Sequence, residues 1–420
     1  MAFCKWLKFR YIKLYRKTYV NMKLYVITPI YATTTDGDGA TPLVHYFARE
    51  WVKLGHDVTV FNFMARFPLP YYWFGKVFQH QLNSHLGMLV PTHSPHNDDF
   101  RVEGVKIIRR TINKYKPHTE YNSTNIEYAL NIIREECKKN GVPDYFMGHW
   151  DSPCMYILPK LKKEFKKPIT IVLHSNQFHF EKRYGADVIS VLKQFDVIGF
   201  RNRAAQEDFE RKYFKPTKFF ICYSGVSDTF LKAGEGVKKS FEEPIKNFIY
   251  IGSLIARKHS NELYEALCKA YPEGNFSIKY IGDGAERVTI EANYTEKKRG
   301  KVEFTGRIPR ESIIAHLKQA DVFAMISRGE IFGLVYIEAM ALGLIPIGSR
   351  NEGIDGIIVN GVNGFLCESG NVDELASIIA KIKTMSKEVL QKMSKAARET
   401  ALNFSDARVA EKYIKDIKID

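Results

Sequence analysis

The sequence contains no long apolar run and no closely spaced pair of cysteines. No stretch approaches the roughly 18 consecutive apolar residues of a membrane-spanning helix, so we expect no transmembrane segment. The six cysteines are scattered and include no C-x-x-C pair. This pattern argues against a disulfide framework and against a zinc cluster, and it favours a reducing, cytoplasmic setting.

Patterns typical of nucleic-acid-binding domains are also missing. The net charge of +15 favours a polyanionic partner, and nucleic acid, an anionic membrane surface and phosphorylated small molecules all fit it. The sequence has no RNP, helix–turn–helix or zinc-finger pattern, and its basic residues are dispersed over both halves. We therefore expect no nucleic-acid partner, and a nucleic-acid-binding protein remains the non-enzymatic alternative.

The N-terminal extension, residues 1–21, lacks acidic side chains. Its first 20 residues contain six basic and six aromatic side chains but not the apolar core of a signal peptide. Such a segment is suited to lie on anionic lipid, which predicts a peripheral protein on the inner face of the cytoplasmic membrane. The alternative is an extension that does little, since "MKLYVITPIYA" from Met22 resembles an ordinary protein start.

Two regions alternate buried strands with helices, as expected because 420 residues favour more than one domain. The first, residues 22–230, opens with a strand, a helix and a second strand, which is one βαβ unit of a doubly wound sheet. Residues 231–245 lack apolar periodicity and are predicted to be a linker. The alternation restarts in residues 246–403, and residues 404–420 form a helix that can pack back on the first region.

The long excursion at residues 64–125 is rich in aromatic, basic and histidine residues. Aromatic rings can stack on sugars, and the cations suit a phosphorylated or lipid-linked acceptor. The alternative is a surface excursion with a small core of its own.

The stretch "SRGEIFGLVYIEAMALG", residues 327–343, places two glutamates around the start of a predicted helix. A helix beginning near Gly333 presents free N–H groups and a positive dipole end, which suit phosphate. An ionised carboxylate can accept hydrogen bonds from two hydroxyls, so Glu338 could hold a ribose and Glu330 a second sugar beyond the phosphates. The alternative is two solvated glutamates on an amphipathic helix.

Three further turns follow predicted strands. Arg257 and Lys258 come after a strand ending in Gly252 and Ser253, where two cations could neutralise a diphosphate; the alternative is a solvated turn. "YIGDG", with Gly282, and "FTGRIP" end the next two strands. Because ligands of parallel sheets bind at the carboxyl ends of strands, all these turns are expected to line one sheet edge at a cleft between two sheets.

This ordered set resembles the retaining GT-B glycosyltransferases of family 4. The matching motifs are "YIGSLIARK", "YIGDG", "VEFTGRIP", "ADVFAMISRGEIFGLVYIEAMALGLIPIGS" and "NGVNGFL", and Glu330 and Glu338 reproduce the family's E-x7-E motif. The second half is covered densely, and the first more loosely by "GHDVTVF", "PDYFMGHW", "ITIVLHS" and "GVSDTF". The resemblance implies an α/β GT-B fold, in which two Rossmann-like doubly wound parallel-sheet domains face each other across a cleft, an acceptor domain first and a nucleotide-sugar donor domain second.

The resemblance also implies roles for individual residues. Glu338 looks like the ribose ligand, and Glu330 like the contact to the donor sugar. Arg257 and Lys258 look like the diphosphate clamp, and His174 matches a histidine that approaches the donor sugar from the other domain; without the family, it would be a satisfied histidine at a strand end. Further donor-binding positions are Gly252, Ser253, Gly282, Arg307 and Ile308 near the base, and Ile331, Phe332, Gly333 and Leu334. Gly37 and Gly39 fall in the loop that nears the phosphates and acceptor.

The sequence departs from the family at two places. Many members have Arg where this chain has Ser253, which places more of the clamp on Arg257 and Lys258. The loop after the first strand has "DGDGA" instead of paired glycines; Asp36 and Asp38 mimic a D-x-D metal motif but are interpreted as turn residues.

Family membership implies a hexosyltransferase that works with retention of configuration and without a metal or other cofactor. The donor would be a UDP- or GDP-sugar, and the acceptor a hydroxyl of a saccharide or lipid-linked molecule in polysaccharide or glycolipid synthesis, such as capsule or lipopolysaccharide. A sugar-nucleotide 2-epimerase, which shares the two-domain architecture, is the alternative enzyme.

Overall fold

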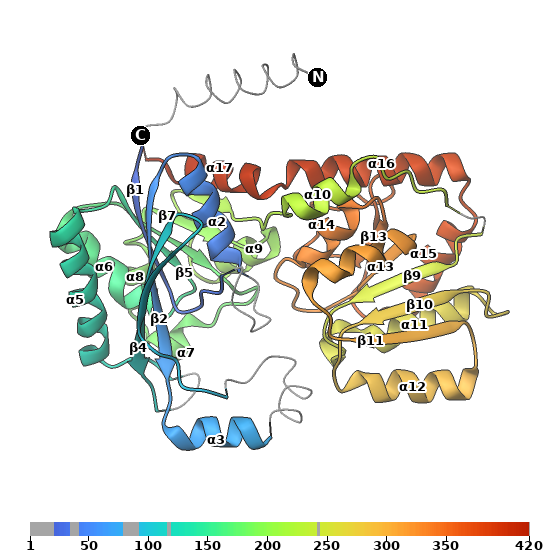
Figure 1. Ribbon diagram of the computed structural model, residues 1–420, viewed down its shortest axis with the longest axis horizontal. Helices are drawn as coiled ribbons and strands as arrows, with labels where there is room; N and C mark the ends of the chain where they lie inside the picture. The colour runs from blue at the N-terminus through green and yellow to red at the C-terminus, as the bar shows by residue number, and fades with distance from the viewer. Residues whose placement is uncertain (1–20, 34–41, 79–91, 116–118, 242–243, 420) are drawn as a thin grey trace, which may run out of the picture.

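The computed structural model describes residues 21–33, 42–78, 92–115, 119–241 and 244–419. Two α/β units lie side by side, and two C-terminal helices run along one edge of both (Figure 1). Almost all of the N-terminal extension, together with Gly37 and Gly39, lies outside the described residues.

The first unit is built on an eight-stranded sheet in the order β3-β4-β2-β1-β5-β6-β7-β8. All neighbouring strands pair in parallel except β3, which is antiparallel to β4. Strands β1, β2, β5, β6 and β7 are almost continuously buried, because helices cover both faces of the parallel part, whereas the edge strand β3 is mostly exposed. Their bounds are Lys23–Thr28 (β1), Asp57–Arg66 (β2), Asp98–Val102 (β3), Val105–Asn113 (β4), Tyr145–His149 (β5), Ile169–Leu173 (β6), Val197–Phe200 (β7) and Phe219–Ile221 (β8).

The helices of this unit alternate with its strands. They are Leu43–Lys53 (α2), Leu69–Val77 (α3), Ser123–Asn140 (α5), Cys154–Phe165 (α6), Phe180–Tyr184 (α7), Val188–Leu192 (α8) and Arg203–Lys212 (α9). Asn122 and Asn202 start α5 and α9, since each side-chain oxygen accepts a backbone N–H of the first turn.

The second unit is a six-stranded parallel sheet in the order β11-β10-β9-β12-β13-β14. Its strands are Asn247–Ile251 (β9), Ser277–Ile281 (β10), Lys301–Gly306 (β11), Val322–Ala324 (β12), Ile345–Ser349 (β13) and Phe365–Cys367 (β14). Its α-helices are Ser260–Ala270 (α11), Glu286–Lys297 (α12), Ile313–Gln319 (α13), Leu334–Ala341 (α14), Val372–Lys383 (α15) and Lys387–Asn403 (α16). The predicted fold class, two parallel-sheet Rossmann-like units, is confirmed.

The stretch predicted to be a linker, residues 231–245, is more structured than expected. Helix α10, Asp228–Gly234, enters it, and Phe241 and Ile245 are buried. Lys239 is buried as well, and its ammonium donates to the carbonyls of Leu317 (3.1 Å) and Lys318 (2.9 Å), near the end of α13. The segment lacks apolar periodicity because single buried side chains, and the contact of Lys239 with the C-terminus of α13, hold it in place instead of a regular apolar face.

The last helix, α17 (Asp406–Ile417), returns to the first unit and packs against α2 (Figure 1). Tyr413 and Ile414 are buried in the core on one face of the first sheet, and the indole of Trp51 donates to the carbonyl of Ala410 at 3.0 Å. The domain boundaries themselves stay predictions.

Candidate active site

The turns at the carboxyl ends of β9, β10 and β11 lie against one another. The N–H of Gly252 donates to Ile281 at 2.9 Å, and the N–H of Gly282 donates to Gly306 at 2.9 Å. Gly282 has φ 136°, and a Cβ there would lie 1.9 Å from the carbonyl oxygen of Gly252. Glycine is therefore required for this packing, which brings three predicted donor turns to one edge.

Lys258 and Glu330 form an ion pair at that edge. Both side chains are largely buried, and the hydroxyl of Ser327 also donates to Glu330, at 3.3 Å. The neighbouring Arg257 joins the same loops, because its carbonyl accepts the N–H of Arg328 at 2.7 Å. The structure thus brings the predicted cation turn and the first glutamate together.

The helix predicted near Gly333 is α14, which begins at Leu334 with Gly333 in the left-handed region at φ 75°. Glu352, which sequence reasoning missed, orients the preceding loop by accepting the N–H groups of Gly329 (2.8 Å) and Glu330 (2.6 Å). Burial raises the pKa of Glu352, and the two N–H groups partly offset that effect. No local motif marks Glu352, because its role depends on the turn that places it against another loop.

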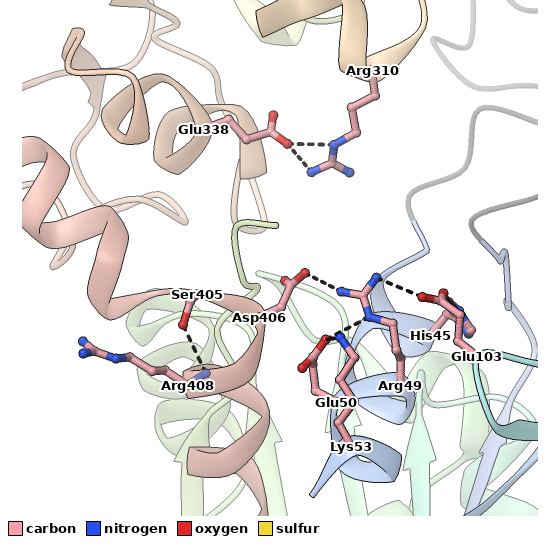
Figure 2. A network of polar contacts seen from close by, with 10 residues as sticks. All are labelled: His45, Arg49, Glu50, Lys53, Glu103, Arg310, Glu338, Ser405, Asp406 and Arg408. Atoms are coloured by element: carbon pink, nitrogen blue, oxygen red, sulfur yellow. Dashed lines mark hydrogen bonds and ion pairs between the residues drawn. The ribbon is translucent and has the colours of Figure 1, made fainter. Parts of the chain in front are cut away.

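The second glutamate, Glu338, is paired with Arg310 (Figure 2). Arg310 Nε donates to Oε1 of Glu338 at 2.7 Å, and Nη2 donates to the same oxygen. Among the described residues, no group donates to Oε2 of Glu338, although the side chain is only 4% exposed. Because Glu330 is 14% exposed, neither glutamate is a solvated surface residue, and that alternative is wrong.

Arg310 is a site residue that the sequence did not reveal. It comes three positions after Arg307, which is exposed and was predicted to meet the base, whereas Ile308 packs against the core. The Arg310 guanidinium also lies over the ring of Tyr46 in α2, 5.9 Å from its centroid. The second predicted carboxylate therefore lies at the boundary between the two units.

His174 follows β6 in the first unit. Its Nε2 lies 3.0 Å from Nδ1 of His149, and its ring stacks on Trp150 with centroids 3.9 Å apart. Burial, with the positive charge of Arg201, holds the pKa of His174 well below its usual value, so the ring is neutral at pH 7.

Two asparagines of the first unit hold the Glu330 loop. Asn176 donates to the carbonyl of Glu330 at 2.8 Å, and Asn202 donates to the carbonyl of Ile331 at 2.7 Å. Asn202 also donates to the side-chain oxygen of Asn176 at 2.7 Å. The loop after β6, which carries His174, is thereby joined to the loop that carries Glu330. No local pattern encodes this junction, because the bonds to Glu330 and Ile331 span 154 and 129 residues.

A buried polar network lies near the start of α17 (Figure 2). Arg49 in α2 donates to Asp406 at 2.9 Å and to Glu50 at 2.9 Å, and it lies 3.8 Å from Glu103, which also contacts His45 at 2.8 Å. Burial raises the pKa of Asp406 to about 6, although Arg49 opposes that shift. The network ties α17 to α2 and to the turn between β3 and β4.

Solved structures share this arrangement of two units. A glycosyltransferase from Rickettsia africae ESF-5 superposes with a TM-score of 0.67, over 94% of this chain and 98% of that chain, at 18% identity. The chain has the GT-B fold. Sucrose-phosphate synthase from Thermosynechococcus elongatus gives a TM-score of 0.63, with the same coverage and identity.

The second GT-B unit also matches at the level of sequence. Residues 236–400 match the family model described as "Glycosyl transferases group 1". The chain is 27% identical to N-acetyl-alpha-D-glucosaminyl L-malate synthase of Bacillus anthracis over 58% of each chain. It is 32% identical to sulfoquinovosyl transferase SQD2 of Arabidopsis thaliana over 39% of this chain and 31% of that protein. These matches span less than two thirds of the relatives' lengths.

Proposed function

We propose that the protein is a retaining glycosyltransferase of family 4 that transfers a hexose from a UDP- or GDP-sugar. The observation that carries the proposal is a set of two ion pairs with buried carboxylates: Lys258 pairs with Glu330 before the start of α14, and Arg310 pairs with Glu338 within α14. The match to a glycosyl transferases group 1 model and the names of the relatives support sugar transfer. GT-B neighbours solved with UDP and glucose, or with UDP-2-fluoro glucose, support a nucleotide-sugar donor.

In this proposal the donor lies along the edge of the second sheet. Oε2 of Glu338 accepts from the ribose hydroxyls, while Arg310 holds Oε1. The diphosphate meets the N-terminus of α14 together with Arg257 and Lys258, and Glu330 holds the sugar. Charge that develops on the leaving β-phosphate is stabilised by these fixed groups.

The transfer step is a front-face displacement. The acceptor oxygen bonds to the anomeric carbon on the side from which the diphosphate leaves, and the leaving phosphate takes the acceptor's proton, so configuration is retained. Neutral His174 adds a polar group beside the sugar without adding charge.

We further propose that transfer needs no metal or other cofactor, because Arg257, Lys258 and the helix terminus supply the positive field. In the described ranges, no group of three or more His, Cys, Asp or Glu side chains could hold a metal ion. We expect the transfer rate to be the same in EDTA as in Mg²⁺. A loss of activity on chelation would contradict metal-independent transfer.

The acceptor is proposed to be a saccharide or lipid-linked molecule used in polysaccharide or glycolipid synthesis, at the inner face of the cytoplasmic membrane. No helix of the described chain is long and apolar enough to cross a bilayer. Helix α3 exposes Leu69, Trp73 and Phe74, which supports contact with lipid. Membrane binding is tested by sedimentation of the protein with anionic vesicles. If deletion of residues 1–21 leaves the bound fraction unchanged, the N-terminal extension has no role in that binding.

The proposed activity is tested by incubation with UDP- and GDP-sugars, with and without a panel of glycosides. A transferase forms a glycoside only with acceptor and otherwise hydrolyses the donor slowly. A new sugar nucleotide without acceptor would show the 2-epimerase instead. Binding of generic RNA without any sugar-nucleotide binding would favour the nucleic-acid alternative.

A further inference from the structure

The donor loop, residues 329–333, is held from its own unit at one end. The carboxylate of Glu352 accepts the N–H of Glu330 at 2.6 Å, and the N–H of Gly353 donates to the carbonyl of Glu330 at 2.9 Å. A Cβ at Gly353 would lie 2.4 Å from the carbonyl oxygen of Ile331, so the two loops meet backbone to backbone. The second unit therefore fixes the start of the donor loop by itself.

The first unit holds the next part of the donor loop through two side-chain amides. Asn176, which follows β6, donates to the carbonyl of Glu330 at 2.8 Å, and Asn202, which follows β7, donates to the carbonyl of Ile331 at 2.7 Å. The Asn202 amide also donates to the side-chain oxygen of Asn176 at 2.7 Å. The two amides therefore hold each other as well as the loop.

The contact with Phe332, the next residue of the donor loop, is made by a buried cation. The guanidinium of Arg201 lies 5.6 Å from the centroid of the Phe332 ring, and both residues are buried. Arg201 is itself held by the carbonyl of Cys222 and the hydroxyl of Ser224, which accept its N–H groups. The first unit therefore contacts three consecutive residues of the donor loop, two through amides and one through a charged group.

These contacts set the direction of N–H groups in the donor loop. A trans peptide unit is planar, and its C=O and N–H point in opposite directions. Holding the carbonyls of Glu330 and Ile331 therefore also fixes the N–H groups of Ile331 and Phe332. In the described part of the chain, no group accepts either N–H, so both are available to a ligand. No helix or strand maintains their direction, because α14 begins only after Gly333.

We propose that Asn176 and Asn202 are positioning residues for the transfer step. They act through the donor loop, because they keep the backbone of Glu330 and the adjacent N–H groups directed at the donor, and they do not touch the donor themselves. The donor loop of the second unit then depends on the first unit for its active geometry. The inference rests on the proposed function for its catalytic meaning, whereas the holding of the loop can be measured separately.

Asn202 can be changed without loss of its helix cap. Its Oδ1 accepts an N–H of the first turn of α9 at 2.7 Å, and Asp and Ser are also good N-caps. Asn202→Ser and Asn202→Asp therefore keep a cap but have no amide to donate to Ile331. Only the Asp variant adds a charge beside Arg201, so an effect that both variants share is due to the lost amide.

A second position and a matched control complete the set of variants. Asn176→Ala removes the other amide from a loop residue that caps no helix, so it tests the same contact without touching α9. The controls are Asn122→Ser and Asn122→Asp, because the exposed Asn122 caps α5 by the same kind of bond, at 2.8 Å. Circular dichroism shows which variants are folded.

Three quantities are measured on the full chain. Turnover of a panel of UDP- and GDP-sugars, with and without acceptor glycosides, gives kcat, and calorimetric titration gives the Kd of UDP and GDP. Hydrogen–deuterium exchange followed by mass spectrometry reports on residues 329–333. In both Asn202 variants and in Asn176→Ala, we expect kcat to fall at least tenfold, Kd to stay within threefold, and exchange in residues 329–333 to be at least fivefold faster. The Asn122 variants should match the wild type in all three.

Wild-type kcat in a folded Asn202→Ser or Asn176→Ala protein would overturn the proposal, and so would unchanged exchange in residues 329–333. An equal loss of kcat and of nucleotide affinity would overturn it as well, because the contact would then serve nucleotide binding as a whole. If exchange rises as expected but no protein, the wild type included, hydrolyses or transfers a sugar, the proposed function fails and the holding of the donor loop by the two asparagines stands.

Discussion

The two units have related sheets but use their charged groups differently. In the second unit, Lys258 and Arg310 come from the turns after β9 and β11, and they pair with Glu330 and Glu338 around the start of α14. In the first, the buried pair Arg49–Asp406 joins helices to each other (Figure 2). Charged groups at the edge of a parallel sheet can contact a ligand. The charged pair between α2 and α17 instead fixes the position of α17 on the first unit. This division of roles can be tested by separate changes in each unit.

The largest effect is expected at the first ion pair. Lys258→Ala and Glu330→Gln should each lower kcat at least about 100-fold, because each removes a fixed group that acts where charge develops in the transition state. Circular dichroism should show an unchanged fold. Lys269→Ala is the control, since it breaks an exposed pair with Asp373 on the surface of the same unit. Wild-type turnover in either active-site variant would contradict the role proposed for Lys258 and Glu330 in transfer.

The next effect concerns the first unit and is a pH dependence of stability. The pKa of Asp406 is about 6 in the folded chain, against 3.8 for an ordinary Asp. The folded state therefore binds the proton more tightly, so this group's contribution to stability is greatest below pH 3.8 and is lost as the pH rises to 6. The loss is about 3 kcal/mol.

Asp406→Asn keeps a side-chain oxygen for Arg49 but cannot ionise. Denaturant unfolding at pH 4.5 and pH 7 should show the variant gaining stability relative to the wild type as the pH rises. The wild type and the variant losing equal stability over that range would contradict the role of Asp406.

A smaller effect is expected at the second ion pair. Arg310→Ala should weaken binding of nucleoside diphosphates about 10-fold, because Glu338 loses the group that orients its carboxylate. Calorimetric titration measures the change, and Arg287→Ala, which removes an exposed pair with Glu291, is the matched control. An unchanged Kd in a folded Arg310→Ala protein would place the nucleotide elsewhere.

The smallest effect is expected where α17 meets α2. Trp51→Phe removes the hydrogen bond to the carbonyl of Ala410 and keeps an aromatic ring in the core. We expect a loss of about 1 kcal/mol in the free energy of unfolding and unchanged donor hydrolysis. Trp73→Phe, at an exposed position of α3, should change neither. A loss of donor hydrolysis in Trp51→Phe would contradict this expectation, because it would show that the contact between α17 and α2 also affects the donor site of the second unit.

In the second unit, the sequence predicted the turns at the strand ends and the start of α14, but not the side-chain pairs between them. The start of α14 at Gly333 and the order of the strand-end turns follow from local patterns of glycine and apolar residues. The partner of Glu338 is Arg310, 28 residues away and on a different turn, which no local pattern encodes. Asp406 and Arg49 are 357 residues apart, so their pairing appears only once α17 is placed on α2.

The central claim is that Glu338 holds the ribose of a nucleotide bound to the second unit. It is tested most directly by calorimetric titration of UDP and GDP, and of their 2′,3′-dideoxy forms, into the wild type and Glu338→Gln. We predict that the wild type binds one ribonucleotide at least about 10-fold more tightly than its dideoxy form, and that Glu338→Gln loses most of this preference. An equal preference in both proteins, or no binding of either nucleotide to the wild type, would contradict the claim.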